Sequence, residues 1–194
     1  DVAKVSEDGL RLSKVQALFI SAGLEENDKF HGDRKFRTLS KFFKDLQNLK
    51  AQKPDSKFKG KLRDYQKLGL DWLTKISENQ FGGILADDMG LGKTIQVLAL
   101  LSQNASNKHM PSLVLAPKSL IFNWQNEAAI FTPHLKVLNY SGINRKEMWK
   151  QIPTQDLILT TYQTLRNDIE FFQKQKFNYL ILDEAHYLKN SGSQ

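Results

Sequence analysis

The sequence predicts an α/β fold in which a parallel sheet is covered by helices on both faces. From residue 81 onward, short apolar runs alternate with longer amphipathic runs, which is the pattern of repeated strand–helix units. Several of the short runs are apolar at every position, so both faces of those strands must be buried. A length of 194 residues suits one such domain, or one domain plus a fragment of another.

The expected strands and helices follow one another in a regular order. Strands are predicted at residues 83–86, 112–116, 136–140, 157–160 and 179–182. Helices are predicted between them at residues 93–102, 119–131, 145–151 and 162–172. Pro117 ends the second strand, and Ser119 stands at the N-cap position of the helix that follows. Trp124 falls within this helix, and we interpret it as a core residue.

The first 80 residues have a different pattern. Apolar residues recur three or four positions apart in two segments, 39–49 and 62–76, which predicts two amphipathic helices. The polar, lysine-rich residues 51–60 between them are interpreted as a linker. We therefore divide the chain into residues 1–57, a flanking segment that is the tail of an upstream region, and an α/β lobe at residues 58–194.

The composition restricts the class of protein. There is no cysteine, which excludes disulfides and thiolate metal sites. No apolar run is long enough to cross a bilayer, so we expect no membrane partner and an intracellular location. The first residue is Asp and not Met, which indicates that a natural N-terminus lies further upstream.

The formal net charge of +7 is concentrated in one part of the sequence. Residues 29–67 hold 13 Lys and Arg against 4 Asp and Glu. Such a basic stretch is typical of a surface that attracts nucleic acid, but it is equally typical of a solvated lysine-rich face. The sequence leaves both interpretations open.

A glycine-rich loop precedes the helix predicted at residue 93. The motif Gly90-Leu91-Gly92-Lys93-Thr94 combines flexible glycines, whose N–H groups approach phosphate closely, with the positive end of a helix. In such a loop the lysine reaches the β- and γ-phosphates and the Thr hydroxyl binds Mg²⁺. The usual first glycine is replaced by Asp87, with Asp88 beside it. These two carboxylates must point away from the phosphates or be paired.

A second acidic motif follows the last predicted strand. Asp183 and Glu184 emerge at its carboxyl end, where open α/β sheets bind their ligands. Asp183 is expected to hold Mg²⁺ and Glu184 to orient or deprotonate the attacking water. An Asp-Glu pair alone is often only a helix N-cap. Together with the glycine-rich loop, it predicts hydrolysis of a nucleoside triphosphate.

Five blocks in fixed order resemble one family. They are LRDYQKLGLDWL (62–73), GGILADDMGLGKTIQ (82–96), SLVLAPKSLIFNWQNE (112–127), DLILTTYQTL (156–165) and YLILDEAHYLKN (179–190). Together they resemble the N-terminal RecA-like motor lobe of the Swi/Snf-type ATPases in helicase superfamily two. The resemblance begins near residue 58, and the segment ahead of it looks more like bacterial members. It implies an incomplete RecA-like lobe that stops after the Asp-Glu-Ala-His motif.

The resemblance also implies roles for individual residues. Gln66 would read the adenine edge, and His186 would couple the ATP site to a second lobe. Segments that contain Lys118, Ser119, Thr161 and Tyr162 would lie on the DNA side. The implied ATP-binding set is Gln66, Asp88, Met89, Gly90, Leu91, Gly92, Lys93 and Thr94, with Lys93 and Glu184 catalytic.

The expected function is that of an ATP-binding, Mg²⁺-dependent motor lobe that moves along double-stranded DNA. Its expected partner is the second RecA-like lobe of the full-length chain, whose arginines the family uses in hydrolysis, so the isolated chain should be nearly inactive. One alternative is an ATPase that works on RNA. Another is a nucleic-acid-binding module with a vestigial ATP site, against which the intact Lys93, Thr94, Asp183 and Glu184 argue. In a bacterium the protein would be cytoplasmic and associated with the nucleoid. The oligomeric state is left open.

Overall fold

The structure is a computed structural model that describes residues 4–6, 9–13, 33–104 and 110–187, together with residues 16, 17, 20 and 23. Its strands are β1 (Lys4–Ser6), β2 (Gly9–Arg11), β3 (Ser112–Leu115), β4 (Val137–Asn139), β5 (Leu157–Thr160) and β6 (Leu180–Leu182). Its helices are α2 (Arg34–Gln47), α3 (Asp64–Glu78), α4 (Lys93–Asn104), α5 (Lys118–Phe131), the 3-10 helix η1 (Arg145–Thr154), α6 (Tyr162–Asn167) and α7 (Ile169–Phe172). In this part of the chain, no helix is long and apolar enough to cross a membrane.

Four parallel strands form the central sheet, in the order β4-β5-β3-β6. All four residues of β3 and all four of β5 are buried, which confirms that apolar runs without alternation lie between two helix layers. Leu115 of β3 is aligned with Thr160 of β5 and with Leu182 of β6. The residues that follow these three strands therefore lie side by side at one edge of the sheet.

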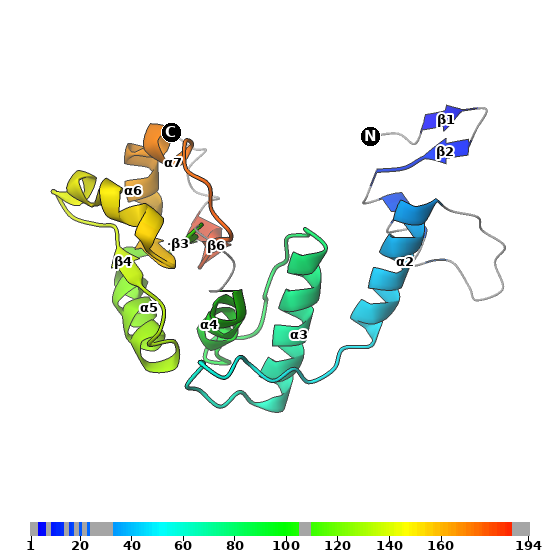
Figure 1. Cartoon of the computed structure of the whole chain (residues 1–194), viewed down its shortest axis with the longest axis horizontal. Coiled ribbons are helices and arrows are strands. Elements are labelled where there is room, and N and C mark those ends of the chain that lie inside the picture. The colour runs from blue at the N-terminus through cyan, green and yellow to red at the C-terminus, as the bar shows by residue number, and fades with distance from the viewer. Residues whose placement is uncertain are drawn as a thin grey trace.

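Alternate residues of β3 belong to two separate cores. Val114 packs with residues of α4 and α5 on one face of the sheet. Leu113 and Leu115 pack on the other face with η1, α6 and α7. Along the molecule, α4 contacts α5 and α3, and α3 in turn contacts α2 (Figure 1). This arrangement confirms the predicted α/β class with helices on both faces.

The strand predicted at residues 83–86 does not form. The segment is extended, but no described strand pairs with it, and a strand exists only through hydrogen bonds to a neighbour. Ile84 is accordingly 85% exposed. Among the described strands, β6 is the edge on this side of the sheet, and Leu180 is 61% exposed there.

Three helix predictions need correction at their ends. Helix α5 begins at Lys118 after Pro117, and Ser119 does not cap it. The helix predicted at 145–151 is a 3-10 helix that continues to Thr154. The helix predicted at 162–172 is divided into α6 and α7 at Asp168.

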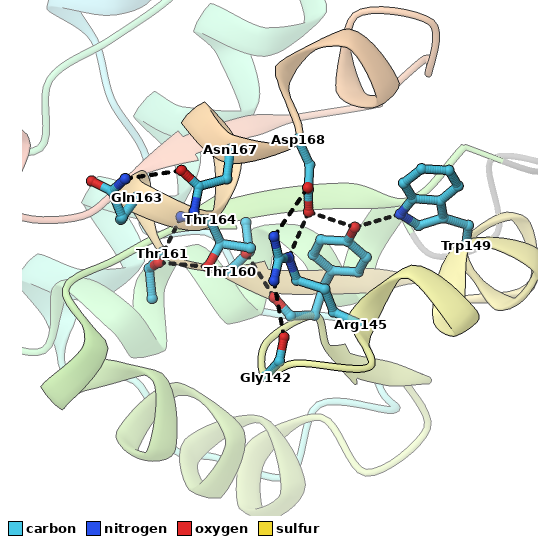
Figure 2. Close-up of polar contacts among 10 residues, drawn as sticks. Gly142, Arg145, Trp149, Thr160, Thr161, Gln163, Thr164, Asn167 and Asp168 are labelled. Atoms are coloured by element: carbon cyan, nitrogen blue, oxygen red, sulfur yellow. Dashed lines mark hydrogen bonds and ion pairs between the residues drawn. The ribbon is translucent and has the colours of Figure 1, made fainter.

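A buried polar network surrounds Asp168, the residue at which α6 and α7 meet. Its carboxylate accepts two hydrogen bonds from Arg145, at 2.6 and 3.1 Å, and one from the Tyr140 hydroxyl at 2.9 Å (Figure 2). Trp149 in turn donates to the Tyr140 hydroxyl. The guanidinium of Arg145 holds the pKa of Asp168 below its usual range, even though burial acts in the opposite direction. The boundary between α6 and α7 therefore coincides with a carboxylate that accepts three side-chain hydrogen bonds.

The two N-terminal helices form as predicted, at slightly shifted bounds. Phe42 of α2 stacks on Phe81, with ring centroids 5.2 Å apart, which attaches α2 to the end of α3. Phe58 is buried in the core and stacks on Phe131. The N–H of the next residue, Lys59, donates to the Phe131 carbonyl at 2.8 Å. Residues of the flanking segment and of the segment interpreted as a linker therefore both pack against the lobe. The division of the chain after residue 57 stays a prediction.

Candidate functional site

The glycine-rich loop is shaped by two glycines with left-handed backbone. Gly90 has φ of 82° and Gly92 has φ of 76°, a region that other residues rarely adopt. A Cβ atom at Gly92 would lie 2.6 Å from Nε2 of Gln66 and 2.9 Å from a methyl carbon of Ile95. Glycine is therefore required at position 92 for both its backbone angle and its space.

The loop closes around the ammonium group of Lys93. Nζ donates to the carbonyl oxygen of Asp87 at 2.7 Å and to that of Asp88 at 3.2 Å. These carbonyl dipoles stabilise the positive charge of the ammonium group. A bound phosphate would have to replace one or both of these contacts before Lys93 could reach it.

The two carboxylates of the loop have different surroundings. Oδ2 of Asp87 accepts a hydrogen bond of 2.9 Å from the side-chain amide of Gln96, whereas the Asp88 side chain is exposed. Gln96 itself is buried and also donates to the Gly92 carbonyl at 3.3 Å. A Cβ at Gly69 of α3 would clash with the Gln96 amide oxygen. One carboxylate is therefore paired and the other is exposed.

Helix α3 contacts the loop through two neighbouring side chains. The Tyr65 hydroxyl and Nε2 of Gln66 both donate to the Leu91 carbonyl, at 2.9 and 3.0 Å. The amide oxygen of Gln66 accepts from the backbone N–H of Arg63 at 2.9 Å. Gln66 is 7% exposed and uses both ends of its amide within the protein. Adenine contact by Gln66 would require it to release at least one of these partners.

The candidate metal ligands offer suitable donor atoms. No hydrogen-bond partner of the Thr94 hydroxyl occurs among the described residues, and none reaches Oδ1 of Asp183 there. A hydroxyl and a carboxylate oxygen are the hard ligands that Mg²⁺ prefers. Within the same part of the chain, no group of three or more His, Cys, Asp or Glu could form a separate protein-only metal site.

Asp183 is held at three points where it leaves the sheet. Its N–H donates to the Leu115 carbonyl at 2.8 Å, which continues the ladder between β3 and β6. Its carbonyl oxygen accepts from the Tyr162 hydroxyl at 2.8 Å. Its Oδ2 accepts from the indole N–H of Trp124 at 2.8 Å. The position of the carboxylate is therefore fixed through both backbone and side chain.

Negative charge is concentrated near Asp183. Glu127 stands one helical turn after Trp124 on α5, and burial raises its pKa, with a further contribution from the charge of Asp183. Burial likewise raises the pKa of Tyr162, with Asp183 and Glu184 contributing, so this hydroxyl stays a neutral donor. A divalent cation would relieve the repulsion between these carboxylates.

Glu184 and His186 lie together beyond β6. Glu184 has φ of 52°, a left-handed conformation that is uncommon for a non-glycine residue and is often found at functional sites. Its Oε2 lies 3.1 Å from Nδ1 of His186, and the His186 side chain is largely exposed. The predicted coupling residue therefore contacts the predicted catalytic carboxylate directly.

The four residues predicted to contact DNA follow β3 and β5 at the same edge. Lys118 and Ser119 are exposed at the start of α5. Thr161 caps α6 by accepting a hydrogen bond of 3.1 Å from the Thr164 N–H (Figure 2). The hydroxyl of Tyr162 is already used by Asp183.

The two halves of the candidate site share one core. Ile95 of α4 and Ile181 of β6 pack against the same apolar cluster, but no hydrogen bond or ion pair joins the glycine-rich loop to Asp183 or Glu184 among the described residues. The sequence interpretation missed two contacts. It did not identify Gln96 as the partner of the Asp87 carboxylate, and it interpreted Trp124 only as a core residue, without its hydrogen bond to Asp183. Trp124 is buried as predicted, and a buried indole N–H usually has a partner, which was the available signal.

Comparison with known proteins identifies relatives of this chain. A family model described as the SNF2-related domain matches residues 65–194. Helicase SWR1 of Yarrowia lipolytica is 42% identical over 151 residues, which are 74% of this chain and 8% of that protein. The probable ATP-dependent DNA helicase CHR23 of Arabidopsis thaliana is 35% identical over 190 residues, 95% of this chain and 18% of that protein. The chain thus spans less than a fifth of these relatives.

A solved structure shares the fold. The SWI2/SNF2 ATPase core of Sulfolobus solfataricus in complex with dsDNA is 37% identical, with a TM-score of 0.67. The match covers 73% of this chain and 29% of that chain. It confirms the predicted RecA-like lobe as the fold.

Proposed function

The chain belongs to the SNF2-related domain family, and we propose that it is the ATP-binding motor lobe of a protein that couples ATP hydrolysis to movement on double-stranded DNA. The observation that carries this proposal is a pair of motifs on two elements, α4 and β6, that pack against one apolar core. A glycine-rich loop folded around Lys93 lies before α4, and Asp183 and Glu184 follow β6. Relatives named as ATP-dependent helicases support the use of ATP.

The residues divide the chemistry as follows. Lys93 and the N–H groups of the loop bind the phosphates, and Glu184 orients the attacking water and accepts its proton. Thr94 and Asp183 would hold Mg²⁺, which would neutralise charge on the phosphate oxygens when bound. The exposed Asp88 and Met89 line the entrance of the loop, where the nucleotide enters.

Nucleotide entry and loop opening are linked by the contacts that Lys93 and Gln66 make within the protein. The ammonium of Lys93 exchanges carbonyl oxygens for phosphate oxygens, and its charge stays compensated throughout. Gln66 exchanges the Leu91 carbonyl or the Arg63 N–H for the adenine edge. The bonds from α3 to Leu91 thus connect base recognition to the loop that holds the phosphates.

Double-stranded DNA is the proposed track. The dsDNA complex of the Sulfolobus relative supports this choice over RNA. Lys118, Ser119, Thr161 and Tyr162 are the proposed contacts to the DNA backbone, which carry no sequence information. A second RecA-like lobe is the proposed partner, coupled through His186. We further propose an intracellular location, which in a bacterium would be the nucleoid.

The alternatives lead to different measurements. An RNA-dependent ATPase would respond to RNA more than to duplex DNA, and a module with a vestigial ATP site would hydrolyse nothing. The isolated chain should bind nucleotide weakly and turn over very little, because the loss of transition-state arginines from a second lobe costs several orders of magnitude in rate.

The decisive experiment is ATP hydrolysis by the full-length protein without nucleic acid and with duplex DNA, single-stranded DNA or RNA. Strong stimulation by duplex DNA that is lost in Glu184→Gln supports the proposal. Stimulation by RNA alone selects the first alternative. Hydrolysis that no nucleic acid changes, or that Glu184→Gln retains, would contradict the proposed motor.

A further inference from the structure

Two aromatic side chains approach Asp183 from opposite faces of the sheet. Trp124 belongs to the core that contains Val114 and α4, whereas Tyr162 packs against the core that contains Leu115. Each ends in one hydrogen-bond donor, and both donors meet at the same residue, at 2.8 Å each. Aromatic residues with a polar end can fill a core and still direct one hydrogen bond to its rim.

The two contacts constrain different parts of Asp183. Tyr162 binds the backbone carbonyl, and the N–H on the other side of the residue is bound to the Leu115 carbonyl. These bonds fix where the residue leaves the sheet. Trp124 binds Oδ2 and so fixes the rotation of the carboxylate. Among the described residues Oδ1 receives no hydrogen bond, so this oxygen is the one available for a ligand.

We propose that Trp124 and Tyr162 are positioning residues for Mg²⁺–nucleotide binding, and that together they hold Asp183 with Oδ1 presented to the metal. The inference rests on the proposed function of this site. Neither residue touches the nucleotide or the metal. Hydrogen-bond partners of metal ligands commonly change metal affinity or activity by about 10- to 100-fold when they are removed.

The same contacts join Asp183 to the proposed DNA side of the lobe. Trp124 lies on α5, which begins at Lys118, and Tyr162 is the first residue of α6 and follows Thr161. A rigid hydrogen bond from each helix therefore ends at the metal carboxylate. Each proposed DNA segment is therefore connected to Asp183 through a hydrogen bond from the helix that it begins.

The test uses Trp124→Phe and Tyr162→Phe in the full-length protein. Each variant removes one donor and keeps the aromatic packing. Trp149→Phe is the matched control, because it also removes an indole donor, but its partner is the Tyr140 hydroxyl in the core on the opposite face of the sheet from Trp124. Thermal unfolding is measured for all variants, so that loss of folding is recognised.

The first readout is the Mg²⁺ concentration for half-maximal binding of a fluorescent ATP analogue. We expect an increase of about 10-fold in Trp124→Phe, a smaller increase in Tyr162→Phe, and no change in Trp149→Phe. The double variant should show less than the product of the two single effects, because both act through Asp183. Unchanged Mg²⁺ dependence in Trp124→Phe, or an equal change in the control, would overturn the proposal.

The second readout is the ATPase rate at saturating and limiting Mg²⁺. We expect raised Mg²⁺ to restore most of the rate in Trp124→Phe, which a defect of folding alone would not permit. A loss of rate that Mg²⁺ does not restore would overturn the proposal. If the wild-type protein hydrolyses no ATP with any nucleic acid, the proposed motor function fails, and the binding readout still decides the role of Trp124.

Discussion

The side-chain amide of Gln96 donates to Oδ2 of Asp87 over 2.9 Å, which explains how a loop for a polyanion accommodates a carboxylate at its start. The bond crosses from the first turn of α4 back to the beginning of the loop. The Asp87 carboxylate is therefore paired with Gln96, while its carbonyl oxygen accepts from Lys93. The carboxylate has a structural role in closing the loop.

Gln96→Ala should weaken nucleotide binding by about 10-fold. The variant leaves a charged, partly buried carboxylate without its donor, and hydrogen bonds to charged groups contribute about 1.5–3 kcal/mol. Isothermal titration with an ATP analogue measures the change. Adding Asp87→Asn should recover part of the loss, because the unpaired charge is removed. An affinity equal to that of the wild type in Gln96→Ala would contradict this role.

Gly69→Ala should destabilise the wild-type lobe by about 1–3 kcal/mol, because the new methyl group would clash with the Gln96 amide oxygen. In a Gln96→Ala background the clash is gone. There the same change should stabilise α3 by up to about 1 kcal/mol, since alanine favours a helix over glycine. Urea unfolding of the four proteins gives the coupling energy. Equal effects of Gly69→Ala in both backgrounds would exclude the contact.

The sequence predicted the buried strands better than the exposed ones. The runs at residues 112–115 and 157–160 became strands because neighbours on both sides complete their hydrogen bonds. Residues 83–86 are equally apolar, but the composition of a segment says nothing about whether a partner strand lies beside it. The predicted last helix is divided at Asp168, whose carboxylate is bound by Arg145, 23 residues away in sequence. Local periodicity contains no information about such a partner.

The sequence motifs identified the residues of the candidate site but not the side chains that hold them in position. Lys93, Asp183 and Glu184 were recognisable because phosphate and metal chemistry restricts both residue type and spacing. Glutamine and tryptophan occur in many structural settings, so Gln96 and Trp124 are not recognisable as site residues by type. Their partners lie 9 and 59 residues away. Only the folded arrangement could assign those partners.

Asp168→Asn should lower stability at neutral pH by about 1.5–3 kcal/mol, because it removes the charge from the hydrogen bonds with the Arg145 guanidinium. The pKa of Asp168 is lowered in the folded state, so its contribution is present above the unfolded pKa near 4 and is lost as the pH falls through the folded value. Thermal unfolding from pH 7 to pH 3 measures this. The variant should show a shallower acid decline than the wild type; parallel curves would contradict the assignment.

Leu180→Lys should reduce self-association of the isolated chain. Leu180 is exposed on β6, which is an edge among the described strands, and apolar edge strands pair with other chains. A lysine there opposes such pairing, at a cost within about 0.5 kcal/mol for a surface change. Light scattering against concentration measures the effect, with Phe122→Lys on the exposed face of α5 as control. An equal decrease of self-association in both variants would show that the added charge, and not the exposed edge of β6, is responsible.

Replacing Lys35, Lys41 and Lys44 of α2 by glutamine tests whether the basic stretch contacts DNA. All three side chains are exposed, and α2 is held against α3 by the stacking of Phe42 on Phe81. If each lysine neutralises one phosphate of duplex DNA, the slope of log affinity against log salt should become shallower by about 2.7. Fluorescence anisotropy with a labelled duplex, at salt concentrations from about 50 to about 200 mM, measures the slope. An unchanged slope would show that these three lysines of α2 do not contact DNA.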